Sequence, residues 1–193
     1  GKAEFHQRFF KTGPGEYGEG DQFLGIRVPQ LRALVRPARG LSHDAVLELL
    51  HSEWHEERLL ALLLMTDRYG RGDAEQRQTI HDAYLANTAW NNNWDLVDSS
   101  AQFIVGPHLD PEDITVLRRL AASADLWERR IAMLATLHWI RRDEFRPALE
   151  IAELLIHDPH DLIHKAVGWM LREVGKRDLV VEEEFLGRHY REM

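Results

Sequence analysis

The residues best suited to chemistry lie in a short stretch from Trp90 to Asp98 that reads Trp-Asn-Asn-Asn-Trp-Asp-Leu-Val-Asp. Asp98 follows Trp94 by four residues. Because positions i and i+4 share one face of a helix, the two side chains should project side by side. Comparable strings further along the chain contain an arginine and another tryptophan, Arg130 and Trp169. Together these four residues predict a surface that stabilises a cation against a flat partner.

Histidine pairs at helical spacing raise the question of a metal site. His51 and His55 are four residues apart, as are His160 and His164. The glutamate between His51 and His55 is placed differently from that of the His-Glu-x-x-His zinc motif, and the sequence offers no evident third ligand. We therefore expect neither a metal nor another cofactor.

A glycine-rich segment lies near the start of the chain. It lacks the Gly-Lys-Ser/Thr ending of a phosphate-binding loop, and its carboxylates would repel phosphate. Its glycines and proline instead predict a turn or a short β-hairpin near residues 9–24.

The elements that must position these residues are expected to be helices. Residues 42–105 contain no proline and are rich in leucine, alanine, glutamate and arginine, which favour helix formation. Apolar residues recur at helical spacing through much of the chain. Breaks between helices are expected at three places: Gly70–Asp73, Gly106–Pro107 and His157–Pro159.

The pattern recurs with a regular period. Trp54, Trp90, Trp127 and Ile163 are 36, 37 and 36 residues apart, and each is expected to open a helix. Two helices per repeat of this length predict an all-α, HEAT-like helical-repeat superhelix, a right-handed stack of helix pairs with a concave face. We expect residues 1–193 to form a single domain of this kind.

Composition sets limits on the protein's environment and partners. The chain of 193 residues is 44% hydrophobic and 29% charged, contains no cysteine and has a net charge of −8. No apolar run approaches the roughly 20 residues that cross a bilayer, so we expect no membrane partner and a cytoplasmic location. The acidity is concentrated: residues 40–116 hold 4 lysines and arginines against 14 acidic residues, whereas residues 1–39 hold 7 against 4. The total charge therefore does not exclude DNA, because binding depends on the local field of one face.

The chain resembles the AlkD-like DNA alkylation repair proteins, a family of HEAT-repeat DNA glycosylases, over nearly its whole length. The resemblance rests on four strings in this order and spacing: Phe23–Ile26 with Pro29 and Arg32; Trp94–Asp98; Trp127–Arg130; and Ile163–Glu173. It implies an active cleft that contains Trp94, Asp98, Arg130 and Trp169, with Arg129 as an adjacent alternative for the arginine. It also implies that the family domain extends beyond Met193 with a basic C-terminal segment.

The resemblance implies a specific reaction. Purines alkylated at N3 or N7 are cationic and leave without a general acid, and one carboxylate can stabilise the positive charge that develops on the sugar. The expected function is hydrolysis of that glycosidic bond in duplex DNA by a monomer near the bacterial nucleoid, without flipping of the base. The expected DNA contacts are Lys165, Arg172, Lys176, Arg27 and Arg32.

Other interpretations remain open. The glycine-rich segment looks like an insertion in a branch of the family that includes non-catalytic proteins that bind branched DNA, so the alternative function is structure-specific DNA binding. A third interpretation is a protein-interaction solenoid with an acidic flank. Asp98 could instead be an ordinary structural partner of Arg130, and Lys165 and Arg172 could lie on a solvated helix face. For four further tryptophans, Trp54, Trp90, Trp127 and Trp139, we predict packing roles.

Overall fold

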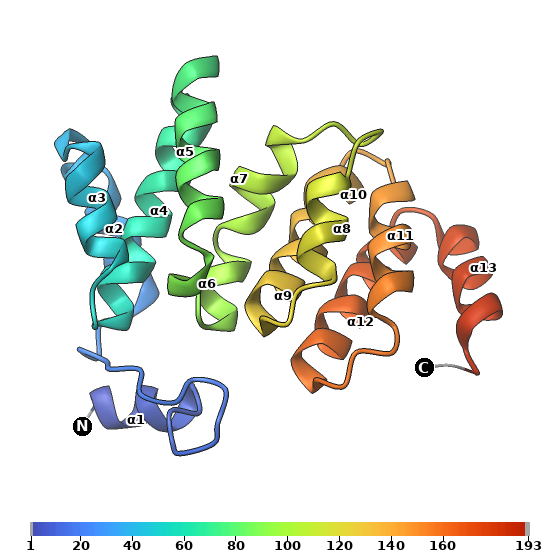
Figure 1. Ribbon diagram of the computed structural model, residues 1–193, viewed down its shortest axis with the longest axis horizontal. Coiled ribbons are helices and arrows are strands. Elements are labelled where there is room, and N and C mark those ends of the chain that lie inside the picture. The colour runs from blue at the N-terminus through green and yellow to red at the C-terminus, as the bar shows by residue number, and fades with distance from the viewer. Residues whose placement is uncertain (1, 192–193) are drawn as a thin grey trace. The chain divides into compact units, whose positions relative to one another are not determined.

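The structure is a computed structural model that describes residues 2–191, and its regular secondary structure within these residues is helical (Figure 1). The prediction of an all-α fold is confirmed. The chain divides into two compact units, residues 1–100 and 101–193, and each is described by itself. The expectation of one continuous domain stays a prediction. None of the described helices is both long and apolar enough to cross a membrane.

The first unit holds six α-helices and two short 3-10 helices. These are α1 (Lys2–Phe9), α2 (Val28–Val35), η1 (Pro37–Gly40), α3 (His43–Leu50), α4 (His55–Arg71), α5 (Ala74–Ala86), η2 (Thr88–Trp90) and α6 (Trp94–Asp98). Helix α4 is the central element of this unit, because it packs against α2, α3, α5 and α6. Figure 1 shows α4 between α3 and α5. Its residues Leu59, Leu62 and Leu64 are almost fully buried and belong to the core of this unit.

The second unit begins at residue 101 and repeats the pattern of paired helices. Its helices are α7 (Ala101–His108), α8 (Thr115–Ala121), α9 (Leu126–Ala135), α10 (Leu137–Ile140), α11 (Arg146–Leu155), α12 (Asp161–Gly175) and α13 (Leu179–His189). Helix α9 packs against α7, α8 and α12, while α12 also packs against α11 and α13. The core of the second unit includes four fully buried residues, Ile131 and Leu134 of α9 and Ile163 and Met170 of α12.

Side-chain caps set several of the helix boundaries. Ser42 accepts a hydrogen bond from the amide of Ala45 at the start of α3, and Asp73 accepts one from Gln76 at the start of α5. Asp73 directly follows Gly72, the C-cap of α4, so the predicted break at Gly70–Asp73 is confirmed. The predicted break at His157–Pro159 also falls between two helices.

The predicted break at Gly106–Pro107 is wrong, because both residues lie within α7. Pro107 cannot donate a helical hydrogen bond, and the helix ends one residue after it. Gly106 is required by close packing: a Cβ atom there would lie 2.4 Å from the carbonyl oxygen of Ala135 and 2.6 Å from the Cβ of His138. The glycine therefore marks a close contact between helices and not a turn.

The predicted repeat holds at three of its four positions. Trp54 caps α4, while Trp127 and Ile163 lie in the first turns of α9 and α12. Trp90 departs from the pattern: it ends the 3-10 helix η2, and the next α-helix opens four residues later at Trp94.

Two of the predicted packing tryptophans, Trp127 and Trp139, are buried, and Trp54 is half-buried. The packing role predicted for Trp90 is wrong. Its side chain is 38% exposed, and its ring lies 5.0 Å from that of His51, which is itself exposed.

The short β-hairpin expected near residues 9–24 is wrong. Helix α1 continues to Phe9, and the chain then follows a series of turns in which Gly20 adopts φ 81°, a backbone conformation that favours glycine. The carboxylate of Glu16 accepts a hydrogen bond from the amide of Gly13. Within the described residues the segment's extended pairing is confined to one isolated bridge, between Gln22 and Trp54.

Candidate functional site

The first two predicted site residues, Trp94 and Asp98, are the first and last residues of helix α6. Asn93 caps this helix by accepting a hydrogen bond from the amide of Trp94 at 2.9 Å. Leu96 and Val97 are fully buried and anchor α6, whereas Trp94 and Asp98 are only half-buried. The helix is short, but its buried side fixes the orientation of both functional side chains.

The ring of Trp94 is packed on aromatic residues from the N-terminal segment. It stacks on Phe10 with a centroid distance of 5.3 Å and an interplanar angle of 23°, and the ring of Phe9 contacts it edge-on at 6.0 Å. One face of the Trp94 ring is therefore occupied within the protein. A flat partner can use only the remaining exposed part of the ring.

This packing continues as a stack of four rings. Phe10 stacks on Phe23 at 5.0 Å, and Phe23 stacks on the imidazole of His55 at 4.4 Å. We call the series Trp94–Phe10–Phe23–His55 the ring stack. The ring stack connects α6 to His55, the first residue of α4. The connecting residues are Phe10 and Phe23, which flank the glycine-rich segment.

Asp98 influences a buried tyrosine on the neighbouring helix α5. Burial raises the pKa of the Tyr84 hydroxyl, and the negative charge of Asp98 raises it further. The hydroxyl of Tyr84 forms a hydrogen bond with the hydroxyl of Ser100 at 2.9 Å. The carboxylate of Asp98 thus lies near a buried polar group, and Tyr84 stays neutral at physiological pH.

The other two predicted site residues lie in the second unit. Arg130, on α9, is buried and donates a hydrogen bond at 2.6 Å to the carbonyl oxygen of Leu162 in the first turn of α12. Trp169, on α12, is half-buried, and its indole nitrogen donates to the carboxylate of Glu173 at 3.2 Å. Of the four predicted site residues, Trp94 and Asp98 therefore lie in the first unit and Arg130 and Trp169 in the second.

The adjacent Arg129 has a structural role. Its guanidinium forms an ion pair with Asp158 at 2.6 Å and donates to the carbonyl oxygens of Ser123 and Ala124. These contacts tie the loop before α9 to the loop before α12. Both arginines thus make contacts within the second unit, and the preference for Arg130 stays a prediction.

The five residues expected to contact DNA are all exposed. On α12, Lys165 forms an ion pair with Asp161 at 2.6 Å, and Lys176, which follows the helix, forms one with Glu173 at 2.6 Å. Phosphate would have to compete with these carboxylates. The remaining three are Arg172 of α12, Arg32 of α2 and Arg27 just before α2.

Sequence reasoning missed a buried polar cluster beneath α6. We call it the His55 cluster, and it comprises His55 and Arg58 of α4, Asp95 of α6 and Asp21 of the glycine-rich segment. All four side chains are buried. His55 does not share a metal site with His51, whose ring nitrogen instead pairs with Asn87 at 2.6 Å. The signal in the sequence was the polar run His-Glu-Glu-Arg at residues 55–58, which opens the helix directly before an apolar run.

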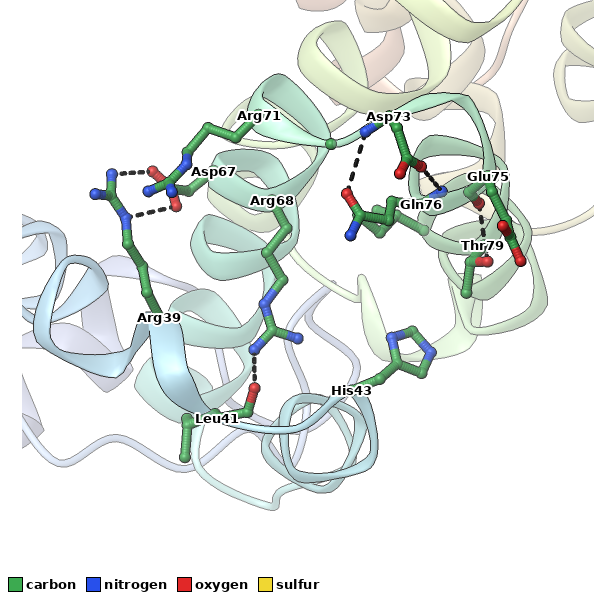
Figure 2. Close-up of a pocket in the computed structure, with 12 residues that line it drawn as sticks. Arg39, Leu41, His43, Asp67, Arg68, Arg71, Asp73, Glu75, Gln76 and Thr79 are labelled. Carbon is green, nitrogen blue, oxygen red and sulfur yellow. Dashed lines mark hydrogen bonds and ion pairs between the residues drawn. The ribbon is translucent and has the colours of Figure 1, made fainter.

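A polar cleft of about 650 Å³ lies elsewhere in the first unit, and Figure 2 shows its lining. Arg39 makes a two-pronged ion pair with Asp67 at 2.9 and 2.6 Å, and Arg68 donates to the carbonyl oxygen of Leu41. None of the predicted site residues lines this cleft. The cleft lies between η1 and the start of α3, the end of α4 and the first half of α5.

Comparison with known proteins identifies the fold and the family of this chain. A solved structure described as a predicted DNA alkylation repair enzyme from Enterococcus faecalis matches with a TM-score of 0.70. The match covers 97% of this chain and 87% of that one at 18% sequence identity, which shows a shared all-α helical-repeat fold. No curated protein matches the sequence. The family model described as DNA alkylation repair enzyme matches residues 1–193, and the chain therefore belongs to the DNA alkylation repair enzyme family.

Proposed function

We propose that this protein is a DNA glycosylase that hydrolyses the N-glycosidic bond of cationic N3- or N7-alkylpurines in duplex DNA. The observation that carries the proposal is the placement of Asp98 one helical turn from Trp94 on the anchored helix α6. Both side chains are partly accessible, while the three residues between them, Asp95, Leu96 and Val97, are buried. Family membership supplies DNA alkylation repair as the setting for this pair.

Asp98 supplies the electrostatic part of the proposed mechanism. An alkylated purine carries a positive charge and departs as a neutral base, so the bond breaks without a general acid. Positive charge then develops on the sugar, where the carboxylate of Asp98 stabilises it and orients a water molecule for attack. At 4 Å and an effective dielectric constant of 20, such a charge pair is worth about 4 kcal/mol, or roughly a thousandfold in rate.

The aromatic residues supply binding of the lesion. A cationic nucleotide against Trp94 or Trp169 gains about 0.5–2 kcal/mol from the interaction of its charge with the ring. Trp94 offers only the part of its ring that Phe10 leaves uncovered. We propose that the lesion contacts this part without leaving the duplex stack.

The remaining features of the proposal follow from DNA as the partner. The exposed residues Arg27, Arg32, Lys165, Arg172 and Lys176 bind phosphates of the duplex, and the helix pairs within each unit form HEAT-like repeats. The protein would initiate base excision repair as a monomer without a cofactor. Its location would be the cytoplasm, at the nucleoid.

The first prediction concerns Asp98. Asp98→Asn removes the charge with little change in shape, so we expect the affinity for DNA to change less than threefold and the excision rate to fall by about a thousandfold. The measurement is single-turnover release of N7-methylguanine from a labelled duplex. Asp44→Asn is the matched control, because Asp44 is an exposed carboxylate in the first turn of α3. Equal excision by the parent and Asp98→Asn would exclude Asp98 as the catalytic carboxylate.

A second candidate function is structure-specific binding of branched DNA without catalysis. The observation that favours it is the ordered glycine-rich segment, whose turns are held by carboxylates of Glu16 and Glu19 on the amides of Gly13 and Gly15. An ordered protruding segment can recognise the shape of a junction. Detection of junction binding with no excision by the parent protein would favour this second function over the first.

A further inference from the structure

Histidine 55 is enclosed between two carboxylates from different parts of the first unit. Its Nδ1 atom lies 2.8 Å from a carboxylate oxygen of Asp21, and its Nε2 atom lies 2.9 Å from one of Asp95. The side chain is 1% exposed. Asp21 belongs to the N-terminal segment and Asp95 to α6, so a single ring connects the two.

The geometry fixes the protonation state of this ring. A neutral imidazole has one N–H group and one lone pair, and it would direct that lone pair at one of the two carboxylates. Only the imidazolium form donates to both. Burial alone lowers the pKa of His55, but the hydrogen bonds to Asp21 and Asp95 and their charges outweigh it and raise the pKa to about 9. Arg58 adds an ion pair to Asp21, so two cations balance two carboxylates.

The same residue reaches the candidate site by a second route. The ring stack runs from His55 through Phe23 and Phe10 to Trp94. Because a cationic ring is attracted to an aromatic face, the positive charge of His55 strengthens its contact with Phe23. His55 therefore acts on α6 through Asp95, the neighbour of Trp94 in sequence, and also on the ring of Trp94.

Glu56, the residue after His55, holds the backbone of the N-terminal segment in place beside the ring stack. Its buried carboxylate accepts hydrogen bonds from three successive amides, those of Leu24 at 2.8 Å, Gly25 at 2.8 Å and Ile26 at 3.1 Å. His6 of α1 lies 3.5 Å from the same carboxylate. The first turn of α4 thus fixes the position of the backbone next to Phe23. His55 in the same turn fixes α6 through its hydrogen bond to Asp95.

We propose that His55 is a positioning residue, which as a doubly hydrogen-bonded cation sets the pose of helix α6 and so of Trp94 and Asp98. The inference rests on the proposed function for its effect on catalysis, but its effect on the pose of Trp94 is independent of that function. It assigns a role in the site to a side chain that lies beneath the surface. A purely structural role would change stability alone.

The test compares His55→Asn with His81→Asn. His81 is also a buried histidine of the first unit, on α5, and its ring lies 3.3 Å from the exposed Asp82. The pose of Trp94 is followed by its tryptophan fluorescence, taken as the difference between each protein and the same protein with Trp94→Phe. The excision rate and the affinity for duplex DNA with N7-methylguanine are measured in parallel.

For His55→Asn we expect red-shifted Trp94 emission, at least twofold greater quenching by acrylamide, and an excision rate at least tenfold lower with affinity within threefold. His81→Asn should reduce the melting temperature and leave both Trp94 readouts and the rate unchanged. If His55→Asn does not fold, Asp95→Asn replaces it, because this variant keeps the His55 contact to Asp21 and should show the same changes to a smaller extent.

Two outcomes would overturn the inference. One is a loss of stability by His55→Asn, or by Asp95→Asn in its place, without a change in Trp94 fluorescence. The other is an equal fluorescence change in His81→Asn. If the parent protein excises no base, the proposed function fails, and the fluorescence comparison alone still decides the role of His55.

Discussion

Two histidines of this protein illustrate how neighbouring charges decide whether the pKa of a buried imidazole falls or rises. In the second unit, burial together with the charges of Arg142 and Arg141 lowers the pKa of His138 to about 4. In the first unit, two carboxylates reverse the effect of burial and raise the pKa of His55 to about 9. The consequences for stability therefore fall in different ranges of pH.

The contribution of His55 to stability should disappear in alkaline solution. Its pKa in the folded state lies above the unfolded value of 6.5, so the stabilisation is complete below pH 6.5 and is lost as the pH rises towards 9. The free energy of unfolding of the parent should exceed that of His55→Asn at pH 6. We expect this difference to shrink by about 3 kcal/mol between pH 6 and pH 9.5, because one pKa unit corresponds to about 1.4 kcal/mol. Urea unfolding of both proteins measures this difference.

The comparison between parent and variant cancels most other groups. His138 acts at the opposite end of the range: its depressed pKa makes its contribution complete above pH 6.5 and lost as the pH falls towards 4. A difference between the two proteins that stays constant from pH 6 to pH 9.5 would contradict a charged His55 in the folded state.

At the scale of elements, the glycine-rich segment separates into a removable part and a structural base. The base consists of Phe10, Asp21 and Phe23, which belong to the ring stack and the His55 cluster. The part between them bonds mainly to itself, as in the contacts of Gly13 with Glu16 and Gly15 with Glu19. Its removal should therefore leave α6 in place.

Replacement of residues 12–20 by a short glycine–serine link tests this division. We expect the melting temperature to change by less than about 4 °C, which corresponds to under 1 kcal/mol in a protein of this size, and excision of N7-methylguanine to stay within threefold. Asp21→Asn is the comparison, because it removes a buried charge that pairs with His55 and Arg58 and should cost about 3 kcal/mol or more. A loss of excision in the loop variant, with folding intact, would assign the segment to the site.

The elements of this protein differ in how well their sequence predicts them. The Ser42 cap located α3, and apolar period located α4 and α12, because these signals lie within a few residues of one another. The pairing of Trp94 with Asp98 on one helix was predictable for the same reason. The stack of Phe10 on Trp94 and the bridge from Asp21 to Asp95 were not, since they join residues far apart in sequence. Likewise, Gly106 was taken for a break because a close helix contact and a turn favour the same residue.

At the scale of the whole molecule, an acidic protein must bind a polyanion. The net charge of −8 opposes DNA at long range, so binding must depend on local clusters of arginine and lysine. In α12, Lys165 is paired with Asp161 whereas Arg172 is exposed. Of these two, Arg172 should therefore contribute more to phosphate binding, because its guanidinium forms no ion pair with the side chains of residues 2–191.

Charge reversal on α12 tests this expectation. Arg172→Glu should weaken binding to any duplex and reduce the slope of log affinity against log salt concentration by about one unit per lost phosphate contact. Arg119→Glu is the matched control, because it changes the net charge equally from an exposed position on α8. Fluorescence anisotropy with labelled duplex at several salt concentrations gives both slopes. Equal slopes for the two variants would mean that Arg172 does not face DNA.

The close contact at Gly106 gives a criterion for sorting related sequences. No side chain fits between α7 and the carbonyl of Ala135, whatever the protein does with DNA, so the fold itself should retain a glycine there. Asp98 is subject to no such steric limit, and a relative that only holds DNA has no need of its charge. Among relatives that keep this glycine, an aspartate at the position of Asp98 should therefore mark repair enzymes. Another residue at that position should mark proteins that bind DNA without catalysing the reaction.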